Sequence, residues 1–237
     1  QLEQMVDQAL RELGSVDIAV ANAGIARGGS ILTMTEEDYD TQMDVNLKGV
    51  YLTVQVCARA MVRGNRGGRI ITISSLAAER PNPGLFAYCG SKAAVRMMTR
   101  CWALDLAPFD ITVNAIGPGV IDTPLGSPLL GEGDLRQQNE RNIPAGRAGL
   151  PMDIGNLAVW LASDEAEYQT GTYTLIDGGI ADAAGFGVLP DPNAPPRDAM
   201  RQVRRQMSGD AVLAMIDQAT ATAMSNFEEL RKQRGLL

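Results

Sequence analysis

The chain has 237 residues, a hydrophobic content of 45% and a formal net charge of -7, values that fit one globular domain or one domain with an appendage. It contains no histidine, which excludes serine–histidine–aspartate and cysteine–histidine catalysis and every zinc site with histidine ligands. Because the chain is acidic, lacks a basic stripe and has no apolar run of roughly 18 residues, we expect neither nucleic acid nor a membrane as its partner.

The first predicted elements are a helix and a buried strand. Apolar residues at near-helical spacing predict an amphipathic helix over residues 1–13, with Gly14 as its C-terminal glycine. The chain begins with Gln1 rather than methionine, and no capping residue precedes it. We therefore expect that an N-terminal segment is missing from the chain, through truncation or through omission. The apolar run over residues 17–21 predicts a parallel strand that ends at Asn22.

Two long helices and two further strands follow. Thr35, with Asp38 three residues later, predicts the start of a helix that continues to about Ala60. The next segments are predicted as a turn over residues 64–68, a strand over 69–74, a helix over 86–107 and a strand over 111–116 that ends at Gly117-Pro118-Gly119.

The last part of the predicted domain contains a loop, a helix and a strand. Glycine and proline recur through residues 122–150, which predicts a mobile loop with short helices. A helix over 153–162 and a strand over 172–176 complete the pattern. Strands that alternate with helices predict an α/β fold with a doubly wound parallel sheet. In such sheets, ligands bind at the carboxyl ends of the strands.

The tail differs in composition from the rest of the chain. We divide the chain into a domain over residues 1–180 and an extension over 181–237. The extension begins with a stiff proline-rich linker over 190–196, and two helices are predicted over 197–207 and 211–233. We expect the extension to pack on its own domain or on a neighbouring subunit. A lid over the active site is the alternative.

A tyrosine and a lysine carry the strongest chemical signal. Tyr88 and Lys92 are four residues apart at the start of a predicted helix, so they share one helix face. A neighbouring ammonium favours phenolate and lowers the pKa of a phenol toward the range of acid–base catalysis. Ser75 lies 13 residues before Tyr88 at the end of a predicted strand, and Asn46 lies on the first long helix.

Together these motifs resemble the short-chain dehydrogenase/reductase family. The chain contains that family's Ser-(x12)-Tyr-x-x-x-Lys pattern, its Asn-Ala-Gly turn at residues 22–24, its helix-borne asparagine and its Pro-Gly turn, in the family's order. Further matches lie at residues 144–147, 160–164 and 171–179. The resemblance runs from Gln1 to about Gly179 and implies a Rossmann-like fold.

The resemblance implies a role for each matching residue. Tyr88 would be the general acid/base, and Lys92 would lower its pKa and bind the cofactor ribose. Ser75 would hold the substrate oxygen, and Asn46 would hold a water in a proton relay. The residues implied to line the cofactor site are Asn22, Ala23 and Gly24 at the adenosine side and Pro118, Gly119, Ile121 and Thr123 at the nicotinamide end. No metal is implied.

The implied cofactor is NAD or NADP, which carries the hydride while the protein positions it. The family opens with a glycine-rich turn that binds the pyrophosphate at a helix N-terminus, and this segment is not found in the chain. The absent segment would comprise two βαβ units, which amount to roughly 60 residues. The residue that selects NAD or NADP belongs to that segment, so the preference stays open.

The substrate, the assembly and the compartment are also expectations. By resemblance, the pocket draws on Leu76, Ala77, Leu85, Phe86, Gly119 and the loop over 124–150, where Leu125, Leu129 and Leu130 favour a secondary alcohol or ketone with apolar bulk. The family pairs two long helices, here 35–60 and 86–107, across a subunit face, so a homodimer or homotetramer is implied. Three cysteines without CxxC spacing indicate free thiols in the cytoplasm.

Two alternatives stay open beside the NAD(P)-dependent oxidoreductase. The chain could be a shortened, non-catalytic member that serves as an assembly or binding module, although a complete catalytic set argues against this. It could also dehydrate, isomerise or epimerise its substrate with the same tyrosine and lysine. Net change in NAD(P)H separates a dehydrogenase from an enzyme that recycles its cofactor.

Overall fold

A four-stranded parallel sheet forms the centre of the computed structural model, which describes residues 1–183 and 211. The strands follow the order β1-β2-β3-β4 across the sheet, and every neighbouring pair is parallel. Their bounds are Ile18–Ala21 for β1, Gly68–Ile73 for β2, Ile111–Pro118 for β3 and Tyr173–Ile176 for β4. Each connection between strands therefore crosses over through a helical segment.

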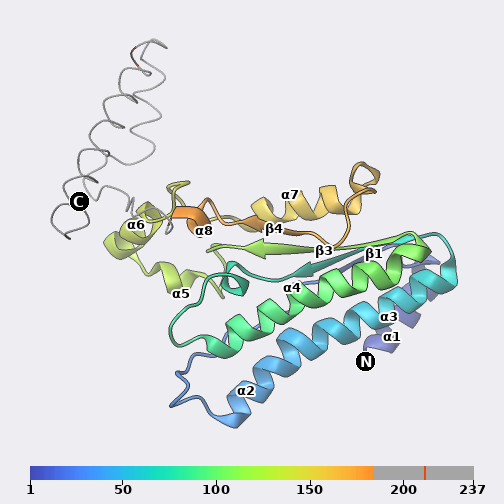
Figure 1. Cartoon of the computed structure of the whole chain (residues 1–237), viewed down its shortest axis with the longest axis horizontal. Helices are drawn as coiled ribbons and strands as arrows, with labels where there is room; N and C mark the ends of the chain where they lie inside the picture. The colour runs from blue at the N-terminus through green and yellow to red at the C-terminus, as the bar shows by residue number, and fades with distance from the viewer. Residues whose placement is uncertain (184–210, 212–237) are drawn as a thin grey trace, which may run out of the picture.

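Helices cover both faces of this sheet (Figure 1). Helices α1, α3 and α4 lie below the sheet in that view, whereas α7 lies above it. The bounds are Leu2–Leu13 for α1, Gly49–Gly64 for α3, Phe86–Leu106 for α4 and Pro151–Ala162 for α7. The prediction of a doubly wound, Rossmann-like α/β fold is confirmed.

Alternate strand residues supply two separate cores. Ile70 and Val113 pack with α3 and α4 in the larger core, whereas Ile71 and Ile116 pack with Leu161 of α7 in the smaller one. All five side chains are at most 1% exposed. Because neighbouring strand residues point to opposite faces, strands buried on both sides are mostly apolar. The buried polar residues of β2 and β3 are Thr72, Thr112 and Asn114.

Local signals place several element ends where the sequence predicts them. Gly14 ends α1 in the left-handed conformation, with φ 83°, which glycine adopts without penalty. Thr35 caps α2 (Glu36–Met43), because its hydroxyl accepts a hydrogen bond from the Asp38 amide. The predicted long helix is interrupted, however, because a π-helical turn over Asp44–Lys48 separates α2 from α3.

One further difference concerns the carboxyl side of the sheet. Strand β3 extends two residues beyond the predicted end, because Gly117 and Pro118 pair with Leu175 and Ile176 of β4.

The segment over 122–150 contains short helices, as predicted. They are α5 (Ser127–Leu130) and α6 (Gly133–Arg141).

The remaining described elements are short. They are α8 (Ile180–Ala183) and three 3-10 turns over Leu76–Ala78, Ala107–Phe109 and Asp164–Ala166. The predicted linker over 190–196 lies outside the described residues, as do both predicted tail helices except Ala211. The division after residue 180 therefore stays a prediction. Within the described part of the chain, every helix is too short or too polar to cross a membrane.

Candidate active site

The side chains singled out in the sequence meet at the carboxyl edge of the sheet. Asn22 follows β1, Ser75 follows β2 by two residues, and Gly119 follows β3 directly. Helix α4 begins at the same edge and carries Tyr88 and Lys92 in its first two turns. Parallel strands bring their carboxyl ends together, so residues far apart in the sequence become neighbours here.

The Ser75 hydroxyl lies close enough to the Tyr88 phenol to lower the pKa of Tyr88 through hydrogen bonding. Ser75 has extended backbone and caps the 3-10 turn Leu76–Ala78, where its hydroxyl accepts a hydrogen bond of 3.1 Å from the Ala77 amide. That hydroxyl therefore has little freedom to turn away. The serine and the phenol are therefore held beside one another.

The pKa of Tyr88 is raised above its ordinary value, opposite in direction to the expected effect of Lys92. Burial of the phenol is the main cause, and the neighbouring Cys89 adds to it, whereas the hydrogen bond with Ser75 lowers the pKa. The Lys92 ammonium lies 5.8 Å from the centre of the Tyr88 ring. Ser75, rather than Lys92, therefore supplies the lowering influence on the phenol in this structure.

Lys92 is a buried ammonium, with a residue exposure of 3%. Burial lowers its pKa to about 8, because removal from water disfavours the charged form. Its Nζ donates a hydrogen bond of 2.9 Å to the Ile73 carbonyl at the end of β2, and Ser74 donates one of 2.8 Å to the Lys92 carbonyl. The lysine is thus tied to the end of β2 through its ammonium, and to the residue that follows β2 through its backbone carbonyl.

Asn46 is fully buried within the π-helical turn. Its Oδ1 accepts a hydrogen bond from the Ile25 amide and its Nδ2 donates one to the Ile25 carbonyl, both at 2.8 Å. A third hydrogen bond of 3.3 Å runs from Nδ2 to the Ser91 hydroxyl. Asn46 therefore joins the loop after β1 to α4, and π-helical turns are frequent at functional sites.

Gly24 lies directly against the buried lysine. A Cβ atom at this position would come within 3.2 Å of Lys92 Nζ and 3.5 Å of Asn46 Oδ1. The Asn22–Gly24 turn is thereby brought beside the two helix residues that the sequence associates with it.

The segment after β3 forms the other side of the site. A Cβ atom on Gly119 would collide with Asp177 after β4, so only glycine fits between these two strand ends. Ile121 is 9% exposed, and the Thr123 hydroxyl accepts a hydrogen bond of 3.1 Å from the Gly126 amide. Pro118 is the last residue of β3 and immediately precedes this segment.

An ion pair connects the segment after β3 to α6. Arg136 Nη2 lies 2.5 Å from Asp122 Oδ2, and the Ser127 hydroxyl donates a second hydrogen bond to the same carboxylate at 2.9 Å. These contacts lower the pKa of Asp122 below its usual value. Of the loop leucines, Leu130 is buried, whereas Leu125 and Leu129 are 46% and 61% exposed.

Sequence reasoning missed three buried or half-buried polar residues at this edge. Ser91 donates a hydrogen bond of 2.8 Å to the Tyr88 carbonyl, Gln42 accepts one from the Arg27 amide, and the Tyr173 hydroxyl donates one to the Ser75 carbonyl. Gln42 could have been found four residues before Asn46, on the same helix face. Ser91 and Tyr173 depend on packing that no sequence spacing shows.

The donor set of this site fits a dinucleotide. Lys92 has three N–H donors, one of which reaches Ile73, and a buried ammonium beside a glycine turn suits the hydroxyls of a ribose. Asn114 serves the fold instead, because its amide bonds Gln169 and Thr172. Among residues 1–183 and 211, no group of three or more cysteines and carboxylates is arranged to hold a metal ion.

The comparisons with known proteins agree with this geometry. Residues 1–181 match a family model described as "Enoyl-(Acyl carrier protein) reductase", which covers more than half of the chain. The chain belongs to the short-chain dehydrogenase/reductase family. It is accordingly an NAD(P)-dependent oxidoreductase of the short-chain type.

Individual short-chain dehydrogenases support this assignment. The 3-oxoacyl-[acyl-carrier-protein] reductase FabG of Thermotoga maritima is 39% identical over 180 residues, which are 76% of this chain and 72% of that protein. A short-chain type dehydrogenase/reductase from Mycobacterium marinum is 42% identical with a TM-score of 0.71, over 76% of this chain and 70% of that one. A gluconate 5-dehydrogenase from Burkholderia cenocepacia, solved in complex with NADP and tartrate, is 32% identical with a TM-score of 0.73, over 77% and 71%.

Proposed function

We propose that the protein transfers a hydride between a nicotinamide cofactor and a secondary alcohol or ketone, with Tyr88 as the general acid/base. The observation that carries this proposal is the proximity of three side chains: the Ser75 hydroxyl acts on the pKa of the Tyr88 phenol, and the buried ammonium of Lys92 lies 5.8 Å from the centre of the Tyr88 ring. In reduction, the Tyr88 hydroxyl gives its proton to the substrate oxygen; in oxidation, the phenolate takes the proton from the alcohol. Ser75 donates a hydrogen bond to the same oxygen and polarises it.

The other residues of the site supply positioning and a proton path. Lys92 binds the ribose hydroxyls with the donors that do not reach Ile73. Asn46 holds the loop after β1 in place and keeps a water in line between that loop and Lys92. Burial raises the pKa of Tyr88 and lowers the pKa of Lys92. Neighbouring titratable groups with pKa values shifted in opposite directions are typical of acid–base sites.

The cofactor-binding set follows from the same edge of the sheet. When bound, NAD or NADP supplies or accepts the hydride. We assign the adenosine side to Asn22, Ala23 and Gly24 and the nicotinamide end to Pro118, Gly119, Ile121 and Thr123. The tight approach of Gly24 to Lys92, and of Gly119 to Asp177, leaves backbone rather than side chain facing the cofactor.

We infer a substrate with apolar bulk. Leu125 and Leu129 are exposed on the segment after β3, where apolar contact with a substrate would bury them. The FabG relatives act on 3-oxoacyl groups attached to acyl carrier protein, as their name states, and such a ketone is compatible with this inference. A screen in which only sugars or highly charged compounds react would contradict it.

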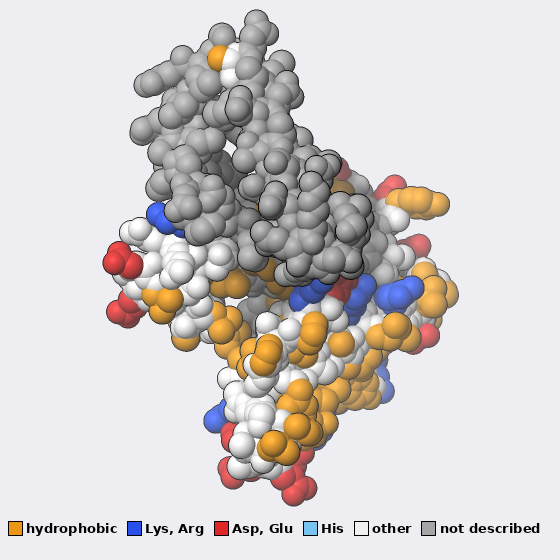
Figure 2. Space-filling view, turned by 60° about the vertical axis from the view of Figure 1, so that its left-hand side comes forward, with side chains coloured by type: hydrophobic (Ala, Val, Ile, Leu, Met, Phe, Trp, Pro, Cys, Tyr) orange, Lys and Arg blue, Asp and Glu red, His pale blue; other side chains and the backbone are white. Residues whose placement is uncertain are grey.

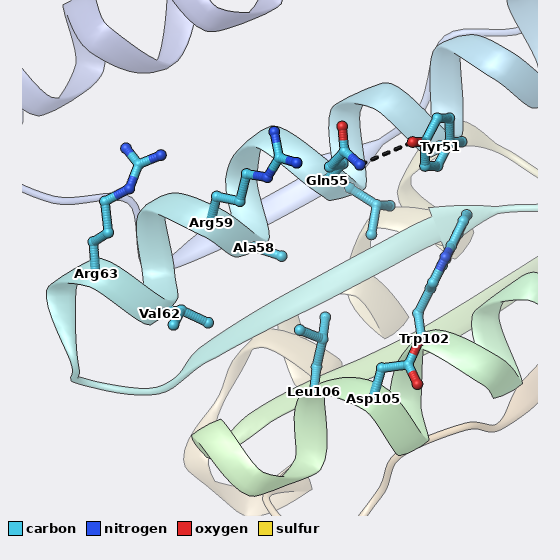
Figure 3. Close-up of a pocket in the computed structure, with 10 residues that line it drawn as sticks. Tyr51, Gln55, Ala58, Arg59, Val62, Arg63, Trp102, Asp105 and Leu106 are labelled. Atoms are coloured by element: carbon cyan, nitrogen blue, oxygen red, sulfur yellow. Dashed lines mark hydrogen bonds between the residues drawn. The ribbon is translucent and has the colours of Figure 1, made fainter.

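We also infer that the protein assembles as a homodimer or homotetramer through α3 and α4. A groove of about 490 Å³ lies between these helices (Figure 3). Val62 of α3 and Leu106 of α4 face one another across it, while Arg59 lines its α3 side and Asp105 its α4 side. An inverted copy of this surface would meet opposite charges and cover the apolar floor.

Exposed apolar side chains extend this surface. Hydrophobic side chains gather on the lower half of the view in Figure 2, over the helices that lie below the sheet in Figure 1. Tyr51 on α3 and Met97 and Leu104 on α4 are 37%, 55% and 78% exposed.

We place the assembled protein in the cytoplasm, since Cys57, Cys89 and Cys101 are unpaired thiols.

The deciding experiment for this function measures stoichiometric cofactor change. The full-length protein is incubated with NADH or NADPH and a panel of ketones, and with NAD or NADP and the matching alcohols. Net oxidation or reduction of the cofactor, equal to product formed, supports the oxidoreductase. Conversion without net cofactor change would indicate an isomerase or epimerase instead. Absence of both conversion and dinucleotide binding would favour a non-catalytic module.

A further inference from the structure

Tyr173 is a phenol on β4 that reaches across the sheet to the catalytic edge. Its hydroxyl donates a hydrogen bond of 2.6 Å to the Ser75 carbonyl. Its ring packs against Gly117 on the neighbouring β3, where any Cβ atom would collide with the phenol oxygen. The side chain therefore spans from β4 over β3 to the residue that follows β2.

A cation from α4 holds this ring in place. The guanidinium carbon of Arg96 lies 4.5 Å from the centre of the Tyr173 ring, a distance typical of cation–π contact. Arg96 Nη1 also pairs with Glu79 Oε1 at 2.8 Å, and Glu79 directly follows the 3-10 turn that Ser75 caps. The same turn is thus linked to Tyr173 directly through Ser75 and indirectly through Glu79 and Arg96.

The surroundings keep this phenol protonated. Burial is the main cause of its raised pKa, and the Glu79 carboxylate beside it is the next. Asp177 after β4 and Tyr88 of α4 raise the pKa further, while Arg96 of α4 opposes them. Tyr173 therefore keeps its phenolic proton at neutral pH and remains a hydrogen-bond donor to Ser75.

Ser75 is tethered at two points by two different phenols. Its side chain lies close enough to Tyr88 to lower the pKa of that phenol, and its carbonyl accepts a hydrogen bond from the Tyr173 hydroxyl. The backbone of Ser75 is extended, with φ -170° and ψ 155°. Its carbonyl also accepts a hydrogen bond of 2.9 Å from the Ala78 amide within the 3-10 turn, so the Tyr173 hydroxyl is a second donor to the same carbonyl. The Tyr173 hydroxyl restrains the peptide plane that sets the direction of the Ser75 hydroxyl.

We propose that Tyr173 is a positioning residue for the reaction, which holds Ser75 so that its hydroxyl meets the substrate oxygen and the Tyr88 phenol together. This inference rests on the proposed function and adds a residue to it. Small displacements of a catalytic group have large kinetic effects, because a 1 Å misplacement can cost about a hundredfold in rate.

The variant Tyr173→Phe tests this role, because it removes one oxygen and leaves the ring between Gly117 and Arg96. We expect kcat to fall roughly tenfold, in line with the loss of one hydrogen bond of up to about 1.5 kcal/mol. The cofactor Kd and the Tm should stay close to those of the unchanged protein. The pH at which alcohol oxidation rises should move upward, because a displaced Ser75 no longer lowers the pKa of Tyr88.

A matched control makes the same tyrosine-to-phenylalanine substitution at an exposed position away from the site. Tyr168 is fully exposed, so Tyr168→Phe should leave kcat, the pH profile and the Tm unchanged. Equal behaviour of Tyr173→Phe and Tyr168→Phe, in a protein that Ser75→Ala impairs, would overturn the positioning role.

A double-mutant cycle shows whether Tyr173 acts through Ser75. In a Ser75→Ala background, Tyr173→Phe should cause no further loss of kcat and no further shift of the pH profile. Full additivity of the two losses would assign Tyr173 another role and contradict the proposal. If the unchanged protein shows no net NAD(P)H change with any substrate, the proposed function fails and this inference fails with it.

Discussion

At the scale of single residues, we expect turnover to depend most on Tyr88, the proposed general acid/base. Replacement of Tyr88 by Phe removes the proton that the substrate oxygen exchanges, so kcat should fall by roughly 10²- to 10⁴-fold, the range of general acid–base catalysis. Cofactor affinity should change little, since Lys92 keeps its hydrogen bond to Ile73. Steady-state rates and dinucleotide titrations check both parts. Full activity in this variant would remove Tyr88 from its role.

The pKa of Lys92 predicts a pH-dependent stability. Its pKa is about 8 in the folded protein, lowered by burial from 10.5. Between these values the unfolded chain binds the proton and the folded chain does not, so the free energy of unfolding rises with pH in this window. The total is on the order of 3 kcal/mol.

The variant Lys92→Met provides the comparison for this stability. Urea unfolding of both proteins between pH 7 and pH 10.5 should show a rising contribution only where Lys92 is present, and parallel curves would contradict the assignment. The same variant should weaken cofactor binding and lower kcat together, because one ammonium serves both.

The sequence predicted which candidate residues lie together, but not the direction of their pKa shifts. The spacing of Tyr88 and Lys92 on one helix face predicts their proximity, and the structure places the ammonium 5.8 Å from the ring centre. The direction of the Tyr88 pKa could not be predicted, because burial of the phenol is a property of the packed molecule. Tyr173 escaped notice for the same reason, since its partners lie on other strands.

At the scale of elements, the Asn22–Gly24 turn packs tightly against the start of α4, and we expect the site to depend on this packing. Gly24→Ala should push its new methyl group against Lys92 Nζ and Asn46 Oδ1. Turnover and cofactor affinity should each fall by about tenfold, an effect of about 1.4 kcal/mol, which kinetics and titration measure. Unchanged affinity would show that the turn can move aside.

A glycine on α4 offers the matched control for that substitution. Gly90 is exposed, and a Cβ atom there would have nothing within 4 Å. Gly90→Ala should therefore raise the free energy of unfolding by about 0.5–1 kcal/mol through helix propensity, with kinetics unchanged.

Element boundaries show how far local signals extend. Thr35 and Gly14 have a fixed local chemistry, so the ends they mark appear as predicted. The π-helical turn at Asp44–Lys48 was not predicted, because it accommodates the buried hydrogen bonds of Asn46 with Ile25 and Ser91. Strand β3 extends to Pro118 because β4 pairs with it, which no local pattern of β3 reveals.

At the scale of the whole molecule, the groove between α3 and α4 predicts an assembly. A charge at its apolar floor should prevent a second copy from covering it, so Val62→Glu should shift the protein toward monomer. Light scattering over a concentration series measures this, with Tyr168→Glu at a fully exposed position as the control. An unchanged assembly in Val62→Glu would place the subunit contact elsewhere.

The fold as a whole was predictable because parallel α/β sheets have strong periodic signals. Four apolar runs separated by helical patterns became four parallel strands with helices on both faces. The contacts within the segment over 122–150 were not predictable. The ion pair of Asp122 and Arg136, for example, joins residues that are 14 positions apart in the sequence.

The close packing of Gly117 and Tyr173 also restricts how this enzyme can diverge. A side chain at position 117 and a phenol at position 173 exclude one another, since any Cβ atom on Gly117 would occupy the space of the phenol ring. Substitutions at the two positions must therefore occur in a fixed order. Tyr173 has to be replaced by a smaller residue before Gly117 can be replaced by a larger one. A chain with Tyr173 therefore requires glycine at position 117, whereas a smaller residue at position 173 would make room for a side chain at 117 near Ser75.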